Sequence, residues 1–518
     1  MISTQKDTKD AGVSKRVSSE KCGMNSDATR LEQLGLHAEL EPTFSLTALL
    51  CLSLCIMATW EAVASVVAQA LASGGVPCLV YNYIATFICT VATTASLAEI
   101  ASIYPTAGGQ YHWVTALFPG RGKKIMSWLT GWISIGGQIV FTASAAFAGG
   151  LMIQGLIILN DAKYAPQRWH GLFLYWAVLV YALLMNTLGY RSLSSANLVA
   201  GVLHIVGFLV ILVTLGVKSE KNTAASVFTD FSNVTGWQSD GIAWLIGLTS
   251  TVFPFLGYDA ACHLAEELPN ASRNVPLAMT GSVVMNVVMG LGFVLMLAFS
   301  TGSLEDILQT PTGFPFMMIF LDATKSTALT TVLALFIVII AVAAAMAGLT
   351  STSRTFWAFA RDDAVPFSNY FAKVGRKQKV PVRAVVLIFI LNMVLGTIYA
   401  GNTTAFNAVL SMAIFGMYLS YMLPIMAMLF YGRNRLRPCD YGPFKLPRWL
   451  GVSCNIIALV WSSVAIFFST FPTQIPVTGM NMNYSSFIMI GWVIFGLIFY
   501  LLNGRYRFKM PVVTTDVQ

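Results

Sequence analysis

Twelve apolar stretches separated by short polar segments constrain this chain more than any other feature of its sequence. A helix needs about 20 apolar residues to cross the hydrocarbon core of a bilayer. The stretches lie at residues 45–72, 76–101, 125–157, 170–189, 194–217, 241–267, 277–300, 327–350, 382–400, 405–430, 449–471 and 485–503. We therefore predict an all-α polytopic membrane protein with twelve transmembrane helices.

The composition argues against the main alternative, a row of soluble domains. Of the 518 residues, 56% are hydrophobic and 10% are charged, whereas a soluble domain carries about 25% charged residues. We expect one membrane domain at 45–505, between an N-terminal tail at 1–44 and a C-terminal tail at 506–518. The N-terminal tail is polar and mixed in charge, and no apolar core follows a basic start before Leu46. We predict a disordered cytosolic segment there and no signal peptide.

The positive charges predict the orientation of the spans. If the N-terminus is inside, the inner loops and the C-terminal tail hold twenty Lys and Arg residues, and the outer loops hold five. This bias is the positive-inside pattern, so we expect both termini in the cytoplasm. It also accounts for the net charge of +8, and we expect a lipid bilayer and no nucleic acid as the partner. Of the candidate membranes, we expect the plasma membrane ahead of the vacuolar one.

Three sequons fall on outer loops in this topology, beginning at Asn233, Asn402 and Asn483. The sequence predicts N-glycosylation at these asparagines. The sequon at Asn270 falls inside and should stay unmodified. The cysteines mostly lie in apolar runs and form no C-x-x-C pair, so we expect neither a disulfide framework nor a structural metal.

Acidic residues are rare within the spans: Glu61, Glu99, Asp259, and the pair Glu266-Glu267 at a span end. A charge at the bilayer centre costs about 2.5–3.5 kcal/mol on insertion scales. Glu61 and Asp259 lie near the middle of their spans, so we expect each to face a cavity, a partner or a substrate. The alternative is a protonated acid bonded to a backbone carbonyl.

The span at 241–267 contains residues that can interrupt a helix. Pro254 has no N–H, and Gly257 tolerates non-helical dihedral angles. The sequence FPFLGYD at 253–259 therefore predicts a discontinuous helix, whose free amides and carbonyls can hold a polar ligand or ion. A simple proline kink is the alternative. The span at 45–72 has no comparable breaker near Glu61, so its own residues predict a continuous helix with one buried acid.

Asp259, His263, Glu266 and Glu267 are spaced i, i+4, i+7 and i+8. This spacing predicts one helical face, along which titratable groups could relay protons from mid-membrane to the cytoplasmic end. The alternative is a packed histidine with two glutamates that cap an inner gate. For His204, in the fifth span, we expect a hydrogen bond between helices.

Three sequence motifs carry a resemblance to a known group of proteins. They are SLAEIASIYPTAGGQYHWVTALFP at 96–119, FLGYDAACHLAEELPNASRNVPLAM at 255–279 and STSRTFWAFARDDAVP at 351–366. In order and spacing they resemble the amino acid–polyamine–organocation superfamily over residues 45–505. The AGGQYHW and HLAEE segments are most similar to its fungal amino-acid/choline transporter family, which includes GABA and choline permeases.

The resemblance implies the leucine-transporter-like fold, with two inverted five-helix repeats plus two helices and with spans 1 and 6 broken. Substrate would lie between the breaks, and Phe253 would be a gate lid. The substrate-binding residues implied are Trp60, Glu61, Ala62, Val63, Phe253, Leu256, Gly257, Tyr258 and Asp259. The chain departs from the family in having no Gly-x-Gly in the first break, where it carries Glu61 instead.

Two mid-membrane acids without an intramembrane Lys or Arg favour a cationic or amine-bearing small molecule. We predict a secondary active transporter, a symporter coupled to protons, for an amino acid, GABA or a polyamine. The alternatives are a choline or quaternary-amine permease and a transport-inactive nutrient sensor. The chain has neither a nucleotide-binding G-x-x-x-x-G-K-[ST] motif nor H-E-x-x-H, so we expect no pump, no enzyme and no cofactor.

Overall fold

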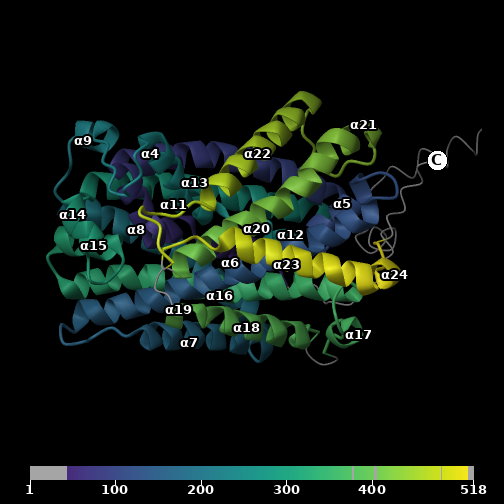
Figure 1. The fold of residues 1–518 in the computed structure, drawn as a ribbon, viewed down its shortest axis with the longest axis horizontal. Helices are drawn as coiled ribbons and strands as arrows, with labels where there is room; N and C mark the ends of the chain where they lie inside the picture. The colour runs from purple at the N-terminus through teal and green to yellow at the C-terminus, as the bar shows by residue number, and fades with distance from the viewer. Residues whose placement is uncertain (1–43, 376–378, 402–404, 480, 512–518) are drawn as a thin grey trace, which may run out of the picture.

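A computed structural model describes residues 44–375, 379–401, 405–479 and 481–511, and these segments contain helices and no strands. The long helices lie side by side in one elongated bundle (Figure 1). The principal helices are α3 (Leu46–Met57), α4 (Thr59–Ile103), α5 (Gln110–Leu117), α6 (Lys123–Asn160), α7 (Arg168–Thr187), α8 (Leu193–Lys218), α11 (Thr249–Val252), α12 (Ala260–His263), α13 (Ala271–Ser300), α16 (Thr327–Arg361), α18 (Val382–Gly396), α20 (Ala405–Ala427), α22 (Arg448–Ser469) and α23 (Ser485–Phe499).

Shorter helices lie at the ends of the bundle and between the long ones. At one end are α9 (Ala224–Thr229), α14 (Leu304–Leu308) and α15 (Pro315–Thr324), and at the other are α5, α17, α21 and α24 (Figure 1). The remaining short helices are α10 (Asp240–Ile246), α17 (Ser368–Phe371), α19 (Ile398–Gly401), α21 (Arg433–Arg435) and α24 (Arg505–Arg507).

Ten helical segments of the described chain are long and apolar enough to cross a membrane. They are Leu46–Ile103, Lys123–Asn160, Arg168–Thr187, Tyr190–Lys218, Asp240–His263, Ala271–Ser300, Thr327–Arg361, Phe406–Arg435, Arg448–Ser469 and Ser485–Arg507. Val382–Gly396 is also apolar but shorter. The chain is therefore an all-helical, polytopic membrane protein.

The first apolar segment is interrupted at Ala58, which has left-handed backbone angles (φ 42°, ψ 48°) between α3 and α4. The N–H of Thr59, at the start of α4, donates to Asn286 Oδ1 on α13 at 3.2 Å. The Thr59 hydroxyl donates to the carbonyl of Pro254 at 2.9 Å. The residues of this span alone predicted a continuous helix, and that prediction is wrong. The interruption lies two residues before the break that the resemblance implied, because residues 60–63 belong to the first turns of α4.

The segment α4 also has a sharp bend in its middle. Gly74 and Gly75 have non-helical dihedral angles, and Gly75 has a positive φ of 70°. A Cβ on Gly74 would lie 2.9 Å from the ring of Phe231, so the loop between α9 and α10 packs against the bend. The bend divides α4 into two helical halves.

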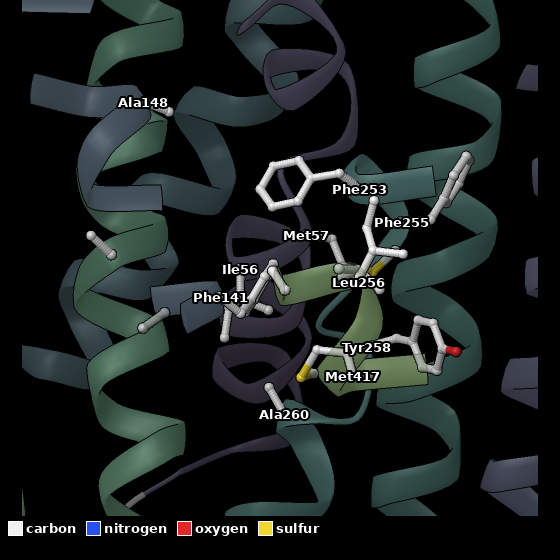
Figure 2. Packing of buried hydrophobic residues seen from close by; sticks show 14 of the residues in the cluster. Ile56, Met57, Phe141, Ala148, Phe253, Phe255, Leu256, Tyr258, Ala260 and Met417 are labelled. Carbon is white, nitrogen blue, oxygen red and sulfur yellow. The ribbon is translucent and has the colours of Figure 1, made fainter. Parts of the chain in front are cut away.

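A second interruption separates α11 from α12. Residues Phe253–Phe255 form one 3₁₀ turn, Leu256 is extended, and Gly257 has a φ of +96°. A Cβ on Gly257 would lie 2.9 Å from the ring of Phe141, so both the dihedral angle and the close packing require glycine. Figure 2 shows Ile56 and Phe141 on one side of this segment and the ring of Tyr258 directed to the other.

The α12 helix has four residues and ends at His263. Leu264 leaves helical geometry, and Ala265–Glu267 form a separate 3₁₀ turn. The prediction of one helical face through residues 259–267 is therefore wrong. Asp259 and His263 still lie close to each other, but Glu266 and Glu267 lie in the 3₁₀ turn after α12 and not on its face.

Candidate functional site

A small cavity lies beside the interruption between α11 and α12. Its volume is about 10 Å³, which is room for about one water molecule. Five helical elements contribute to its wall: α3, α6, α12, α16 and α20. The lining residues are Ile56, Gln138, Phe141, Gly257, Asp259, Ala260, Gly348, Ser351, Thr352 and Met417.

Asp259 is the one charged residue of the cavity wall, and its side chain is almost fully buried. Its Oδ1 accepts a hydrogen bond from the hydroxyl of Tyr421 at 2.6 Å, and its Oδ2 accepts one from Gln110 Nε2 at 2.7 Å. His263 Nε2 lies 3.3 Å from the same Oδ2. Hydrogen bonds to the ionised form stabilise a buried carboxylate, so this network can hold a charge where the membrane would otherwise oppose it.

His263 connects Asp259 to the rest of the polar network. Its Nδ1 lies 2.9 Å from the carbonyl oxygen of Ala107, and its Nε2 lies 2.8 Å from Gln138 Nε2. A carbonyl only accepts, so Nδ1 carries a proton. Nε2 is therefore the atom that gains or loses a proton. Asp259 and His263 together form a buried polar pair beside the cavity.

Glu61 does not line the cavity. It is buried, and its Oε1 lies 2.7 Å from His204 Nδ1 on α8. The ring of Trp60 packs beside this pair, 5.8 Å from the His204 ring and 5.4 Å from the ring of Phe293 between centroids. The expected bond from His204 between helices is thus present, and its partner is Glu61, which was expected to meet the substrate.

The structure brings two of the nine expected substrate residues, Gly257 and Asp259, to the cavity wall. Phe253 packs against the cavity residue Phe141, with 6.0 Å between ring centroids, and Tyr258 packs against Tyr421 at 5.2 Å. The expected residues that do not line this cavity are Trp60, Glu61, Ala62, Val63, Phe253, Leu256 and Tyr258. For Trp60, Glu61, Ala62 and Val63 the difference arises because α4 is already helical at these positions.

Glu266 and Glu267 each form an ion pair with α16 and do not continue the Asp259–His263 pair. Glu266 accepts two hydrogen bonds from Arg361, at 2.9 and 3.0 Å, and Glu267 accepts one from Arg354 at 2.9 Å. Glu266 lies beyond the end of the apolar segment. Burial alone would raise its pKa, but the charge of Arg361 and its hydrogen bonds lower the pKa below the ordinary value. Both glutamates therefore connect the end of α12 to α16.

The fifth acid expected within the spans, Glu99, pairs in a similar way. Its Oε2 accepts a hydrogen bond from Arg433 at 2.7 Å, and its Oε1 accepts one from the N–H of Leu446 at 2.9 Å. These two bonds connect α4 to α21 and to the loop before α22. Together the three glutamate–arginine pairs form a buried polar layer, which we call the salt-bridge layer (Glu99–Arg433, Glu266–Arg361 and Glu267–Arg354).

The predicted glycosylation sites differ in their surroundings. The amide nitrogen of Asn483 is buried and donates to Ser411, to the Ser469 carbonyl and to the Phe471 carbonyl. The amide of Asn483 is therefore enclosed in the folded protein, and glycosylation there stays a prediction. Asn233 lies in the loop between α9 and α10, and its amide nitrogen donates to the carbonyl of Trp237. Asn402 lies outside the described residues.

Several residues of the polar network were not predicted from the sequence, because the prediction selected acids and histidines within the spans as polar candidates. Gln110, Gln138 and Tyr421 contact Asp259 or His263 from 125 or more positions away in the chain. A survey of buried amides and hydroxyls in apolar stretches would have identified Gln138, which follows two glycines in IGGQIV, and the hydroxyl run at 350–353. Their convergence on one carboxylate follows only from the fold.

The chain is a polytopic membrane protein with an internal site, because buried polar groups surround an interrupted helix within its bundle of membrane-spanning helices. Residues 44–495 match the amino acid permease family, and the chain belongs to this family.

The chain is similar over nearly its whole length to several curated proteins. It is 32% identical to a putative amino acid/polyamine transporter of Macrophomina phaseolina, over 84% of this chain and 96% of that protein. It is 28% identical to the choline transporter of Saccharomyces cerevisiae, over 91% and 83% of the two chains. An amino-acid permease of Arabidopsis thaliana is 29% identical over 94% and 97%. These relatives are transporters, and the family is one of permeases.

Proposed function

We propose that this chain is a proton-coupled secondary active transporter of a small amine-bearing solute, such as an amino acid, GABA or a polyamine. The observation that carries the proposal is the position of Asp259. It lines the internal cavity at a helix interruption and adjoins a histidine that can gain a proton. A buried carboxylate attracts the positive end of an amine strongly, because little water screens the interaction.

The helix interruptions support a twelve-span arrangement of two inverted five-helix repeats plus two helices. The segment Leu46–Ile103 has 58 residues, about 87 Å as one helix at 1.5 Å per residue. This is far more than the roughly 30 Å hydrocarbon core, so we infer that it crosses twice, on either side of the Gly74–Gly75 bend. Counting Val382–Gly396 as a crossing gives twelve. The interruptions at Ala58 and Gly257 then fall in spans 1 and 6.

The salt-bridge layer supports a closed pathway on one side of the membrane. It lies on the side of the basic loops, which we assign to the cytoplasm from the positive-inside pattern. In this assignment both termini are cytoplasmic, and the glutamates at 266 and 267 act as parts of an inner gate. We retain the expectation of the plasma membrane as the site of transport.

Choline or another quaternary amine is the second candidate substrate. One relative is named a choline transporter, and Phe141 in the cavity wall offers an aromatic face to a cation. The hydroxyls of Ser351 and Thr352 in the same wall favour a substrate with hydrogen-bonding groups. We therefore place amino acids, GABA and polyamines first.

Uptake of radiolabelled amino acids, GABA, putrescine and choline into cells expressing the chain, at external pH 5 and pH 7.5, tests this function. We expect at least one amine to accumulate above the level of cells without the chain, and faster at pH 5. Equal uptake at both pH values would contradict proton coupling. No uptake of any solute, with the protein present at the cell surface, would contradict transport and favour the nutrient sensor.

A further inference from the structure

Gln138 on α6 combines two observations that point to a role in the site. Its side chain is buried and lines the cavity. Its amide nitrogen lies 2.8 Å from His263 Nε2 and donates to the Ser134 hydroxyl at 3.3 Å. Its amide oxygen, Oε1, has no hydrogen-bond partner among the described residues. Both N–H groups of the Gln138 amide therefore have partners, and Oε1 is the atom without one.

The protonation of His263 determines which way this amide can point. When Nε2 is bare it accepts from the Gln138 NH₂ group, which matches the 2.8 Å contact. When Nε2 carries a proton, two donors would face each other at that distance. The imidazolium can then donate to Asp259 Oδ2, which lies 3.3 Å from Nε2 in the structure. The Gln138 amide group can rotate about the bond between Cγ and Cδ. Its oxygen then faces the histidine, and its NH₂ group takes the former position of the oxygen.

We propose that Gln138 is a protonation-controlled amide switch and that it makes the site specific for amines that also carry a carboxylate. With His263 neutral, the amide offers an acceptor. With His263 protonated, it offers a donor, which suits a carboxylate oxygen and suits a second ammonium poorly. This inference rests on the proposed function, because a symporter must bind its solute more tightly when the proton is bound. Among the proposed solutes, amino acids and GABA meet that condition, whereas putrescine and choline do not.

Few other charged or titratable groups face His263. On its own segment these are Asp259 and Cys262. From α20, Tyr421 reaches it only through Asp259. The neighbours from the loop before α5 and from α6 are the Ala107 carbonyl and Gln138, which do not titrate. The two cations that α16 contributes to the salt-bridge layer, Arg354 and Arg361, are paired with Glu267 and Glu266.

The switch is tested by equilibrium binding of tritiated GABA and tritiated putrescine to the purified full-length chain at pH 5 and pH 8. For the wild type we expect GABA affinity to rise about tenfold at pH 5, the effect of one hydrogen bond to a charged group, and putrescine affinity not to rise. In Gln138→Met the GABA affinity at pH 5 should exceed that at pH 8 by less than about twofold. Gln154→Met is the matched control, a buried glutamine of the same helix that contacts Tyr164 and Gln167, and should keep the ratio.

A second measurement separates the switch from the function on which it rests. Infrared difference spectra of the ligand-free protein between pH 8 and pH 5 should show a shift of a glutamine side-chain carbonyl band. The shift should be absent in Gln138→Met and in His263→Phe, and present in Gln154→Met. Loss of both transport and binding with this band intact would contradict the transporter and leave the switch supported. Three results would overturn the switch. They are an equal rise of affinity at pH 5 for GABA and putrescine, a wild-type rise of GABA affinity in Gln138→Met, and the absence of the glutamine carbonyl shift in the wild type.

Discussion

Asp259→Asn is expected to reduce the initial rate of solute uptake at least about 100-fold, with the protein still reaching the cell surface. The asparagine is close in size, so the packing of the cavity wall, which includes Ile56, Phe141 and Met417, is kept. The change removes the negative charge that attracts the amine and that adjoins His263. The contacts of the carboxylate with the amine and with His263 are two hydrogen bonds to a charged group, each contributing about 1.5–3 kcal/mol. Their loss is together sufficient for a 100-fold effect or more.

The measurement is the initial uptake rate divided by the amount of surface-biotinylated protein. Asp322→Asn is the matched control, because Asp322 lies on α15 in an exposed pair with Lys325, and it should transport like the wild type. If Asp259→Asn retained more than a tenth of the wild-type rate with the same dependence on external pH, Asp259 would be neither the amine contact nor part of the proton site.

Arg361→Ala is expected to have the largest effect on stability. It leaves the buried carboxylate of Glu266 without its bidentate partner and removes a guanidinium that stacks on Trp357, 4.6 Å from the ring centroid. Breaking a buried ion pair on one side costs about 3–5 kcal/mol. Because the pKa of Glu266 lies below its ordinary value, the full penalty is present at neutral pH. The melting temperature of the purified protein should fall by several degrees.

The double variant Glu266→Leu/Arg361→Leu separates this penalty from a loss of packing. Replacing both charges with apolar groups is often neutral, so the double variant should melt closer to the wild type than Arg361→Ala does. Lys325→Ala removes an exposed partner and should leave the melting temperature unchanged. A single variant that melted with the wild type would show that the pair does not hold the end of α12 against α16.

The apolar stretches predicted the helical architecture because length and composition alone determine whether a segment can cross a bilayer. The interruption at Gly257 was foreseen for a local reason, a glycine that follows a proline by three positions. The interruption at Ala58 was not, because no local breaker is present there. Its backbone is held by Asn286 and by the carbonyl of Pro254, which are about 200 positions away in the chain.

The candidate site was predicted in part for the same physical reason. Asp259 stood out because a carboxylate in an apolar stretch is costly, and it lines the cavity. The same rule selected Glu61, but its cost is met by His204 on another helix. Whether a buried acid serves a ligand or a neighbouring side chain depends on long-range packing, and spacing along one span does not reveal it. Gln138 and Tyr421 carry no charge and gave no such signal.

Protection of a cavity residue by substrate tests most directly whether the amine occupies the space beside Asp259. Ser351 lines the cavity, and Ser351→Cys in a background without other cysteines introduces one thiol there. We expect a transported amine to slow the labelling of this thiol by a small methanethiosulfonate reagent at least about tenfold. A thiol in Ala62→Cys, on α4 away from the cavity, should be unaffected. Protection at residue 62 and none at 351 would contradict the account.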